Sequence, residues 1–350
     1  MYRNNPFHNF EHASHVSMSV HKLLSRIVAP DVDTSDEENL AKNLHDHTYG
    51  ITSDPLTHFA CLYSALIHDV DHSGVPNSQL IKENVHIASV YKCKSVAEQN
   101  SVDLAWALLM DDQYTDLRRA IYTTESDFHR FRGLVVNSVM ATDIMDKELS
   151  VARKFRWSKA FAEGCTKENT IAATNRKATI VIEHLIQASD VSHTMQHWHI
   201  FRKWNKRLFQ EMYTAYKEGR AENDPSEFWY KGEIGFFDFY IIPLAKKLKD
   251  CGVFGVSSDE YLNYALQNRK EWEARGEECV AEMKQELESI NFTCDLSQVV
   301  DPVLPQRDEG PSGTVIFDEE EKKEEELLDK PPKSTARLAT PDINFERLFM

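Results

Sequence analysis

The sequence predicts an all-α fold, a compact domain of many helices, over residues 1 to about 294. Apolar residues recur every three or four positions along most of this stretch, which is the period of helices with one buried face. Strand signals, meaning alternating apolar and polar residues between tight turns, are nearly absent, and the chain has only 12 glycines and 12 prolines. A chain of 350 residues, 41% of them hydrophobic, is long enough to bury a sizeable core.

Four helices are predicted in the first 145 residues. Val16–Val28 repeats apolar residues at positions 16, 20, 23, 24 and 27. Leu56–His68 is largely apolar and follows Pro55, and proline favours the first turn of a helix. Val102–Met110 and Phe131–Met145 show the same three- and four-residue spacing.

Four further helices are predicted downstream by the same spacing. They are Ile180–Ser189, Phe201–Tyr216, Phe236–Leu248 and Tyr261–Leu287. Pro76 and Pro225 stand where other helices are expected to begin or end.

The charge and cysteine content exclude several classes of protein. The chain has 56 acidic and 40 basic residues, a net charge of −16, which argues against a general nucleic-acid binder and against electrostatic docking on anionic lipid. No apolar run reaches the roughly 18 residues that span a bilayer, and no secretory-type segment follows Met1. The six cysteines are scattered without a CxxC pair. These features predict a cytoplasmic protein with free thiols.

The last part of the chain differs in character. Between Asp318 and Asp329, eight of twelve residues are acidic, and residues 301–350 carry 13 acidic and 7 basic residues. Such a segment cannot bury enough apolar surface to offset the entropy of ordering. We therefore expect a catalytic-type domain over 1–294 and a disordered acidic tail over 295–350, whose apolar end, Phe345–Met350, could dock elsewhere.

Histidines and aspartates form four groups that together suggest a metal site. Asp190 lies four residues after Ile186, on a helix face that should be buried, and a buried carboxylate needs a cation or several donors. His68 and Asp69 close an apolar helix in the same way. Taken singly, two histidines four residues apart are more often a surface pair that binds nothing, and an Asp at a helix end is more often a helix cap. Taken together, distant imidazoles and carboxylates predict mixed N and O ligands for a metal. The groups are His8-Asn9-Phe10-Glu11-His12, His68-Asp69-Val70-Asp71-His72, Ala141-Thr142-Asp143 and Asp190.

This pattern resembles the class I 3′,5′-cyclic nucleotide phosphodiesterase catalytic domain, a branch of the HD-type metal phosphohydrolases. The HNxxH and HDxxH motifs, about sixty residues apart, and the later lone Asp190 carry the resemblance. Glu98 and Ile234–Asp238 match further, and the resemblance runs from about Asn5 to Asn291. In finer detail the chain is similar to domains that diatoms and related algae carry behind a nucleotide cyclase.

The resemblance implies a role for each matching residue. His8 would be the general acid. Two divalent ions would be bound, usually Zn²⁺ at the first site and Mg²⁺ or Mn²⁺ at the second, with Asp69 shared between them. The remaining implied residues are the first metal's ligands His12, His68, Asp69 and Asp190, and the groups that orient the metal waters, His72, Glu98 and Thr142.

The implied reaction is hydrolysis of cyclic AMP or cyclic GMP to the 5′-monophosphate. Two ions a few ångströms apart can acidify a bridging water and clamp the phosphate. The departing 3′ oxygen needs a proton, and imidazole can supply it because its pKa lies near the working pH. We expect His8 and His12 to lie one turn apart on a single helix, so that His12 binds a metal ion while His8 donates the proton.

The base-recognition pocket is where the sequence departs from the family pattern. Phe236 matches the aromatic clamp, but the position of the usual purine-reading glutamine is Glu233. An ionised carboxylate only accepts hydrogen bonds, so Glu233 would need a raised pKa in an apolar slot to donate one. Glu233 pointing elsewhere is the alternative. His193 stands where asparagine often favours adenine, and the choice between cyclic AMP and cyclic GMP stays open.

Two other departures concern the surroundings of the site. Asn100 and Ser101 replace two histidines that the family usually has after the Glu98 position. The chain also begins at the first motif, where family domains place several helices before it, so a longer parent with an upstream cyclase or transmembrane module is one reading. A homodimer is an open alternative.

Two competing functions remain at this point. Another HD-type nucleotide phosphohydrolase would share the metal ligands, but the His8 acid and the Phe236 clamp favour a cyclic substrate. A catalytically impaired cyclic-nucleotide sensor or regulatory domain would explain Glu233 and the missing helices.

Overall fold

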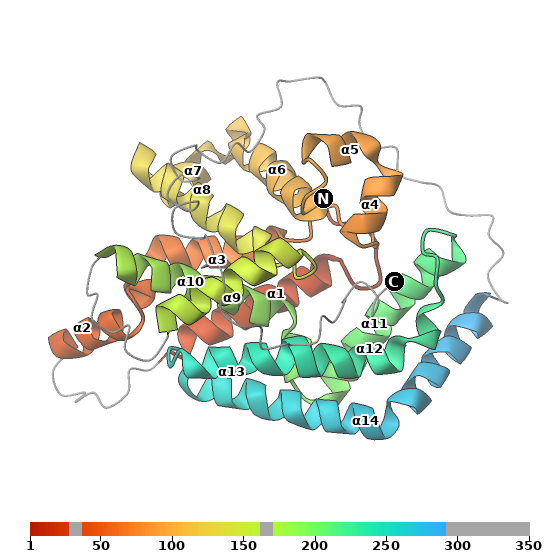
Figure 1. Ribbon diagram of the computed structural model, residues 1–350. Coiled ribbons are helices and arrows are strands. Elements are labelled where there is room, and N and C mark those ends of the chain that lie inside the picture. The colour runs from red at the N-terminus through yellow and green to blue at the C-terminus, as the bar shows by residue number, and fades with distance from the viewer. Residues whose placement is uncertain (28–36, 162–170, 292–350) are drawn as a thin grey trace, which may run out of the picture.

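The computed structural model describes residues 1–27, 37–161 and 171–291, and within these ranges the chain is helical and contains no strand. The all-α prediction is confirmed. Figure 1 shows the helices packed into one body, with the long C-terminal helix along one side.

The α-helices of the described ranges are α1 (Phe10–Ser25), α2 (Glu37–His47), α3 (Pro55–Ile67), α4 (Asn77–Glu83), α5 (Val85–Val90), α6 (Val96–Met110), α7 (Thr115–Ile121), α8 (Glu125–Met140), α9 (Lys147–Phe161), α10 (Ile171–Asp190), α11 (Trp198–Lys217), α12 (Trp229–Phe236), α13 (Ile242–Asp250) and α14 (Gly255–Asn291). Short 3₁₀ turns at Ile51–Ser53, Asp112–Tyr114, Ser192–Met195 and Pro225–Glu227 and a π-helical turn at Phe237–Ile241 join some of them.

Helix α1 lies at the centre of the fold, packed against both α3 and α10. The Asn9 side chain caps its N-terminus by accepting a hydrogen bond from the backbone N–H of His12, and Glu11 in the first turn complements the helix dipole. Val16, Val20 and Leu23 bury one face completely. A buried central helix of this kind can present a polar first turn to the interior.

Two hydrophobic cores flank this centre. The larger core joins α1 and α10 to α11–α14, and the smaller one joins α3, α6 and α8 around the fully buried Phe131. Helix α3 contributes to both, since Cys61 and Ala65 face one core and Ala60 and Ile67 face the other. The end of α3 is therefore fixed from two sides.

The helix predictions are right in kind and differ at some ends. Pro55 occupies the first turn of α3, Pro76 precedes α4 and Pro225 begins a 3₁₀ turn, as expected. The helix predicted to run to Met145 ends at Met140. It stops because the Asp143 carboxylate accepts hydrogen bonds from the backbone N–H groups of Met145 and Asp146, which holds a turn there.

The predicted domain boundary at 294 and the predicted tail, residues 295–350, lie outside the described residues. Among the helices of the described ranges, none combines the length and the apolar character needed to cross a bilayer.

Candidate metal and nucleotide site

The four predicted metal ligands come from three helices whose ends meet in the interior. His12 lies in the first turn of α1, His68 ends α3 and Asp69 follows it, and Asp190 is the last residue of α10. The packing of α1 against α3 and α10 brings these ends together. His12 and His68 are buried, at 0% and 1% exposure.

Ligand atoms of His12, His68 and Asp190 form a close cluster, and Asp69 lies beside its two histidines. The Nε2 atom of His12 is 3.1 Å from Asp190 Oδ1 and 3.6 Å from Asp69 Oδ2. The Nε2 atom of His68 is 3.0 Å from Asp69 Oδ2 and 3.3 Å from Asp190 Oδ1. One ligand atom each from His12, His68 and Asp190 forms a set with all separations below 4.8 Å.

The hydrogen bonds of His68 show that this cluster suits a cation. Its Nδ1 atom donates to the backbone oxygen of Ala65 at 2.9 Å, so Nε2 is the ring atom that faces the two carboxylates. Burial opposes a charge on this ring, but the two carboxylates raise the pKa of His68 well above its usual value, so Nε2 carries a proton unless a metal ion takes its place. That buried Nε2 makes no hydrogen bond of good geometry, and neither does the buried Nδ1 of His12. A lone pair facing carboxylate oxygens is repelled unless a proton or a metal ion lies between them. The donor set of two imidazoles and two carboxylates fits a divalent metal of the zinc type.

The electrostatics of the cluster favour ionised carboxylates. Burial alone would raise the pKa of Asp69, but the neighbouring His68 holds it well below its usual range. Burial opposes ionisation of Asp190 in the same way, and the hydrogen bond from His12 and the nearby charge of His68 outweigh it and lower its pKa. Both carboxylates therefore remain acceptors, as metal ligands must.

His8, the predicted acid, lies just before α1 and not on it. The prediction that His8 and His12 share a helix is wrong, because the helix begins at Phe10 after the Asn9 cap. Their ring centroids are nevertheless only 6.2 Å apart. The Nδ1 atom of His8 pairs with Oε1 of Glu211 on α11, whose Oε2 accepts the backbone N–H groups of Phe7 at 2.9 Å and His8 at 3.0 Å.

This pairing changes the protonation of His8. Burial would lower the pKa of His8, but the charge of Glu211, with smaller contributions from Asp69 and Asp190, raises it to about 9. The imidazole is thus protonated near neutral pH, and Glu211, with a pKa of about 2, stays ionised. The sequence reading missed Glu211.

His72 packs directly on the acid. Its ring stacks on that of His8 with centroids 3.8 Å apart, and its Nδ1 accepts a hydrogen bond from the backbone N–H of Gly74 at 3.2 Å. Burial and the His8 charge lower the pKa of His72 to about 4, so His72 is neutral. Asn5 ties both segments, because its Nδ2 donates to the backbone oxygens of His72 and His8.

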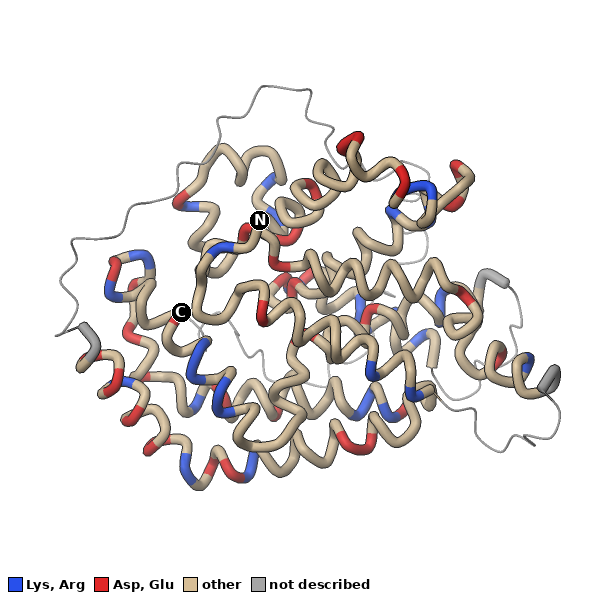
Figure 2. Tube along the Cα trace, turned by 180° about the vertical axis from the view of Figure 1, so that it is seen from behind, with Lys and Arg blue, Asp and Glu red and all other residues tan. Residues whose placement is uncertain are grey.

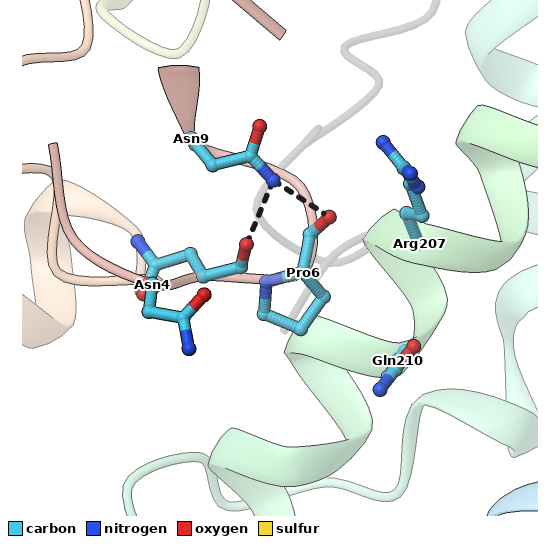
Figure 3. Close-up of a pocket in the computed structure, with 6 residues that line it drawn as sticks. Asn4, Pro6, Asn9, Arg207 and Gln210 are labelled. Carbon is cyan, nitrogen blue, oxygen red and sulfur yellow. Dashed lines mark hydrogen bonds between the residues drawn. The ribbon is translucent and has the colours of Figure 1, made fainter. Parts of the chain in front are cut away.

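Asn9 fixes the segment that carries the two histidines. Its Oδ1 caps α1, and its Nδ2 donates to the backbone oxygens of Asn5 and Pro6 at 2.8 and 3.1 Å. Figure 3 shows these two bonds at the edge of a cavity of about 360 Å³. Arg207 and Gln210 of α11 line its other side. One side chain therefore holds both the approach to α1 and its first turn.

The remaining predicted water-orienting groups are less closely tied to the cluster. Glu98 accepts from Asn77 Nδ2 at 2.9 Å, and burial, with the Asp143 charge, raises its pKa to about 8. The Thr142 hydroxyl donates to the backbone oxygen of Val139 at 2.7 Å. Asp143 accepts from the Ser95 hydroxyl and from the turn described above, so it acts as a cap.

Glu233 points into the interior, at 3% exposure, and contacts Asn205 of α11. Burial raises the pKa of Glu233 to about 8, with the hydrogen bond from Asn205 opposing the shift. Trp229 orients the asparagine, because its Nε1 donates to Asn205 Oδ1 at 3.2 Å and thereby turns the amide nitrogen toward Glu233. The expected neutral carboxyl in a buried slot agrees with this geometry.

Of the other two predicted base-pocket residues, His193 lies beside the metal cluster, and Phe236 packs on Tyr240. The Phe236 ring stacks on Tyr240 with centroids 5.3 Å apart, and the Tyr240 hydroxyl is close enough to Asp190 for that charge to raise its pKa further. His193, at 6% exposure, lies beside His12 with ring centroids 6.4 Å apart, and both rings contact Trp204.

Two residues of the site carried a signal that the sequence reading did not use. Glu211 lies seven residues after Trp204, on the apolar face of α11, so the argument from a buried carboxylate that found Asp190 applies to it as well. Asn205 is a buried amide beside the same Trp, and such a group needs partners.

Comparisons with known proteins agree with this geometry. Residues 7–253 match the family model described as 3′5′-cyclic nucleotide phosphodiesterase. A probable 3′,5′-cyclic-AMP phosphodiesterase of Caenorhabditis elegans is 27% identical over 78% of this chain and 38% of its own length. A dual specificity calcium/calmodulin-dependent 3′,5′-cyclic nucleotide phosphodiesterase of Homo sapiens is 26% identical over 70% of this chain and 31% of its own length. The chain thus spans about a third of the length of these curated relatives.

The fold is shared with a solved structure. The phosphodiesterase domain of the Salpingoeca rosetta rhodopsin phosphodiesterase superimposes with a TM-score of 0.59 at 24% identity, covering 82% of this chain and 80% of that domain. With the family model matching residues 7–253, most of the described chain, this chain belongs to the 3′,5′-cyclic nucleotide phosphodiesterase family.

Proposed function

We propose that this chain hydrolyses 3′,5′-cyclic AMP, cyclic GMP or both to the 5′-monophosphate. The convergence of His12, His68, Asp69 and Asp190 carries the proposal, because it joins a divalent-cation site to a protonated histidine, His8, whose ring centroid is 6.2 Å from that of His12. The names of the relatives, one a cyclic-AMP enzyme and one a dual specificity enzyme, support the same substrate class.

The four ligands would hold a first divalent cation, and Asp69 would be shared with a second. Two imidazoles and two carboxylates suit Zn²⁺, while a site completed by one carboxylate and water suits Mg²⁺ or Mn²⁺. When bound, such ions activate water and neutralise the phosphoryl oxygens. His72 and Glu98, from the side of α3 and α6, would orient water around the second cation, and Thr142 would do so with the lone pairs that its hydroxyl retains.

His8 would donate the proton that the departing 3′ oxygen requires. Its Nδ1 is held by Glu211, so Nε2–H is the free donor, and the pairing keeps the ring protonated at neutral pH. Glu211 is a positioning residue, because it acts through His8. Stacking of the neutral His72 on the ring fixes its plane.

The purine would lie against Phe236 and be read by Glu233. In its neutral form Glu233 can both donate and accept a hydrogen bond, as the glutamine that the family uses can. Asn205 occupies one carboxyl oxygen from α11, so the direction of the remaining donor would decide between adenine and guanine.

Turnover of cyclic AMP and cyclic GMP, measured with defined Zn²⁺ and Mg²⁺ or Mn²⁺, tests the proposal. The native chain should release the 5′-monophosphate. His8→Ala should keep metal and nucleotide binding and lose turnover by roughly 10²- to 10⁴-fold. An exposed histidine of α8 provides the matched control, and His129→Ala should leave turnover unchanged.

The same measurements separate the alternatives. A sensor domain would bind cyclic nucleotide without turnover by the native chain. Another HD-type phosphohydrolase would hydrolyse nucleotide triphosphates or linear esters in preference to the cyclic substrates. Glu233→Gln should change the ratio of cyclic AMP to cyclic GMP turnover, and an unchanged ratio would contradict a base-reading role for Glu233.

The setting of the domain is part of the proposal. A cytoplasmic location follows from the composition, and attachment to an upstream module is suggested by the rhodopsin-linked relative and by the expected likeness to cyclase-linked algal domains.

A further inference from the structure

A group of cations on α9 and α13 forms a basic face in an otherwise acidic chain. Arg153 and Lys154 of α9 and Lys246 and Lys247 of α13 make up this basic face. The two helices meet there, because Lys247 Nζ lies 5.2 Å from the ring centroid of Trp157 on α9. Figure 2 colours the Lys and Arg positions along the whole described trace, those of α9 and α13 among them.

The basic face has no counter-charge of its own in the described ranges. No carboxylate of the described residues forms an ion pair with any of its four members, whereas the nearby Arg156 and Lys249 are paired with Glu183 and Asp259. The guanidinium of Arg153, at 7% exposure, donates to two backbone oxygens, those of Met140 and Asp143. Uncompensated cations at close range raise the free energy of the folded state.

The surroundings of Lys247 show how crowded these cations are. Its Nζ donates to Nε2 of His184 at 3.5 Å, because His184 Nδ1–H is already bonded to the backbone oxygen of Ile180. Burial lowers the pKa of Lys247 to about 8, and the charges of Lys154 and Arg153 add to the shift. His184 stays neutral, with a pKa lowered to about 3 by burial and by Lys247. An anion placed at this surface would relieve the repulsion.

The basic cluster on α11 is different and serves as an internal comparison. Arg202 and Lys206 pair with Glu282 and Glu286 of α14, and Lys203 and Arg207 pair with Glu11 of α1. Those cations are already neutralised within the fold. An unmatched positive surface is therefore a property of the α9–α13 face and not of every basic helix here.

The chain itself supplies a matching anion. The acidic segment, Asp318–Asp329, has eight acidic and two basic residues. Twenty-six residues, 292–317, separate it from the end of α14 at Asn291. Fully extended, that connection spans about 90 Å, whereas a domain of this size is about 50 Å across, so the segment can reach the basic face. A partner on the same chain also has a high effective concentration.

We propose that the acidic segment docks on the basic face of its own chain. The contact is electrostatic and supplies the missing counter-charge at Lys154, Lys246 and Lys247. The buried Arg153 adds to the positive potential there without touching the segment. It is independent of the proposed hydrolytic function.

Zero-length carbodiimide cross-linking of the full chain, read by peptide mass spectrometry, tests this contact. Amide links should form between carboxylates of the acidic segment and the amines of Lys154, Lys246 or Lys247 in monomeric protein. They should be lost at 1 M salt, where the screening length falls to about 3 Å. Links between Lys206 and Glu286 serve as the positive control for the reaction.

Two charge-reversal variants, each with the same change in net charge, make the test specific. Lys154→Glu with Lys246→Glu, both at exposed positions, should abolish the links from the acidic segment to Lys247. Lys42→Glu with Lys270→Glu, exposed on α2 and α14, should retain them. The proposal is overturned if the control links form without any link to the basic face, if the links survive in the first variant, or if they occur only in covalent dimers.

Discussion

At the scale of single residues, the site depends on polar groups held in unusual protonation states by burial and by one neighbour each. His8 is charged because Glu211 faces it, His72 beside it is neutral, and Glu233 is neutral because it is buried. The sequence predicted the identity of most of these residues. It did not give their partners, because these lie far away in the chain. Glu211 follows its partner His8 by about two hundred residues, and Asn205 precedes its partner Glu233 by about thirty.

The Glu211 pair leads to a pH prediction. In Glu211→Gln the carboxylate that raises the pKa of His8 to about 9 is removed, so the protonated acid should be lost at lower pH. The alkaline limb of the kcat/KM profile should move down by about one to three pH units. Glu218→Gln, an exposed change at the C-cap of α11, is the control and should leave the limb in place. An unmoved limb in Glu211→Gln would refute the pairing as the source of the shift.

Glu233 leads to a stability prediction of defined sign. Its pKa is raised from 4.5 to about 8 in the folded state, so the folded chain keeps this proton to higher pH than the unfolded chain does. The free energy of unfolding should therefore fall between about pH 4.5 and 8, by at most about 5 kcal/mol from this group. In Glu233→Gln the free energy of unfolding should fall less over this pH range, because the contribution of Glu233 is absent.

Urea unfolding at pH 5 and pH 8.5 measures this difference. Glu98, with a pKa also raised to about 8, contributes to the native fall, so the comparison of native and variant chains isolates Glu233. Glu222→Gln, at an exposed position, should follow the native curve. Parallel curves for native and Glu233→Gln chains would show that Glu233 is ionised when folded.

At the scale of secondary-structure elements, the site is made by helix ends. The N-terminus of α1 and the C-termini of α3 and α10 deliver His12, His68 and Asp190. Apolar periodicity located these helices, since periodicity reports which face is buried. It did not locate their ends, because caps such as Asn9 and the Asp143 turn depend on single hydrogen bonds.

The Asn9 cap allows the element and the site to be tested together. Asn9→Ala should destabilise the fold by about 1 kcal/mol and also lower turnover, because the same side chain holds the segment before His8. Asn84→Ala removes the matching cap of α5, which carries no residue of the proposed site, and should affect stability alone. Equal turnover in the two variants would argue against a positioning role for Asn9.

At the scale of the whole molecule, the two cores meet at the metal cluster. Because the cluster sets carboxylates against buried imidazole lone pairs, bound cations should stabilise the fold. At a free metal concentration of 100 Kd the gain is about 2.7 kcal/mol. Chelation should therefore lower the Tm of the native chain, and restored Zn²⁺ should raise it again.

Asp190→Ala is the variant that tests this linkage. Its Tm should respond little to chelation or to Zn²⁺, because one of the three clustered ligands is gone. Asp112→Ala, an exposed change in a 3₁₀ turn, should keep the native response. If the Tm of the native chain did not change on chelation, that result would contradict the metal site itself.

The sequence by itself determined the helical class and predicted the residues of the site, because helix periodicity is local and because the motif residues are spaced within single turns. The tertiary structure alone decided which carboxylate faces His8, that Glu233 is held by Asn205 and Trp229, and that the cations of α9 and α13 lack a counter-charge. These properties depend on distances between helices remote in the chain, and electrostatic and hydrogen-bond energies are set by such distances and by burial, which no local pattern encodes.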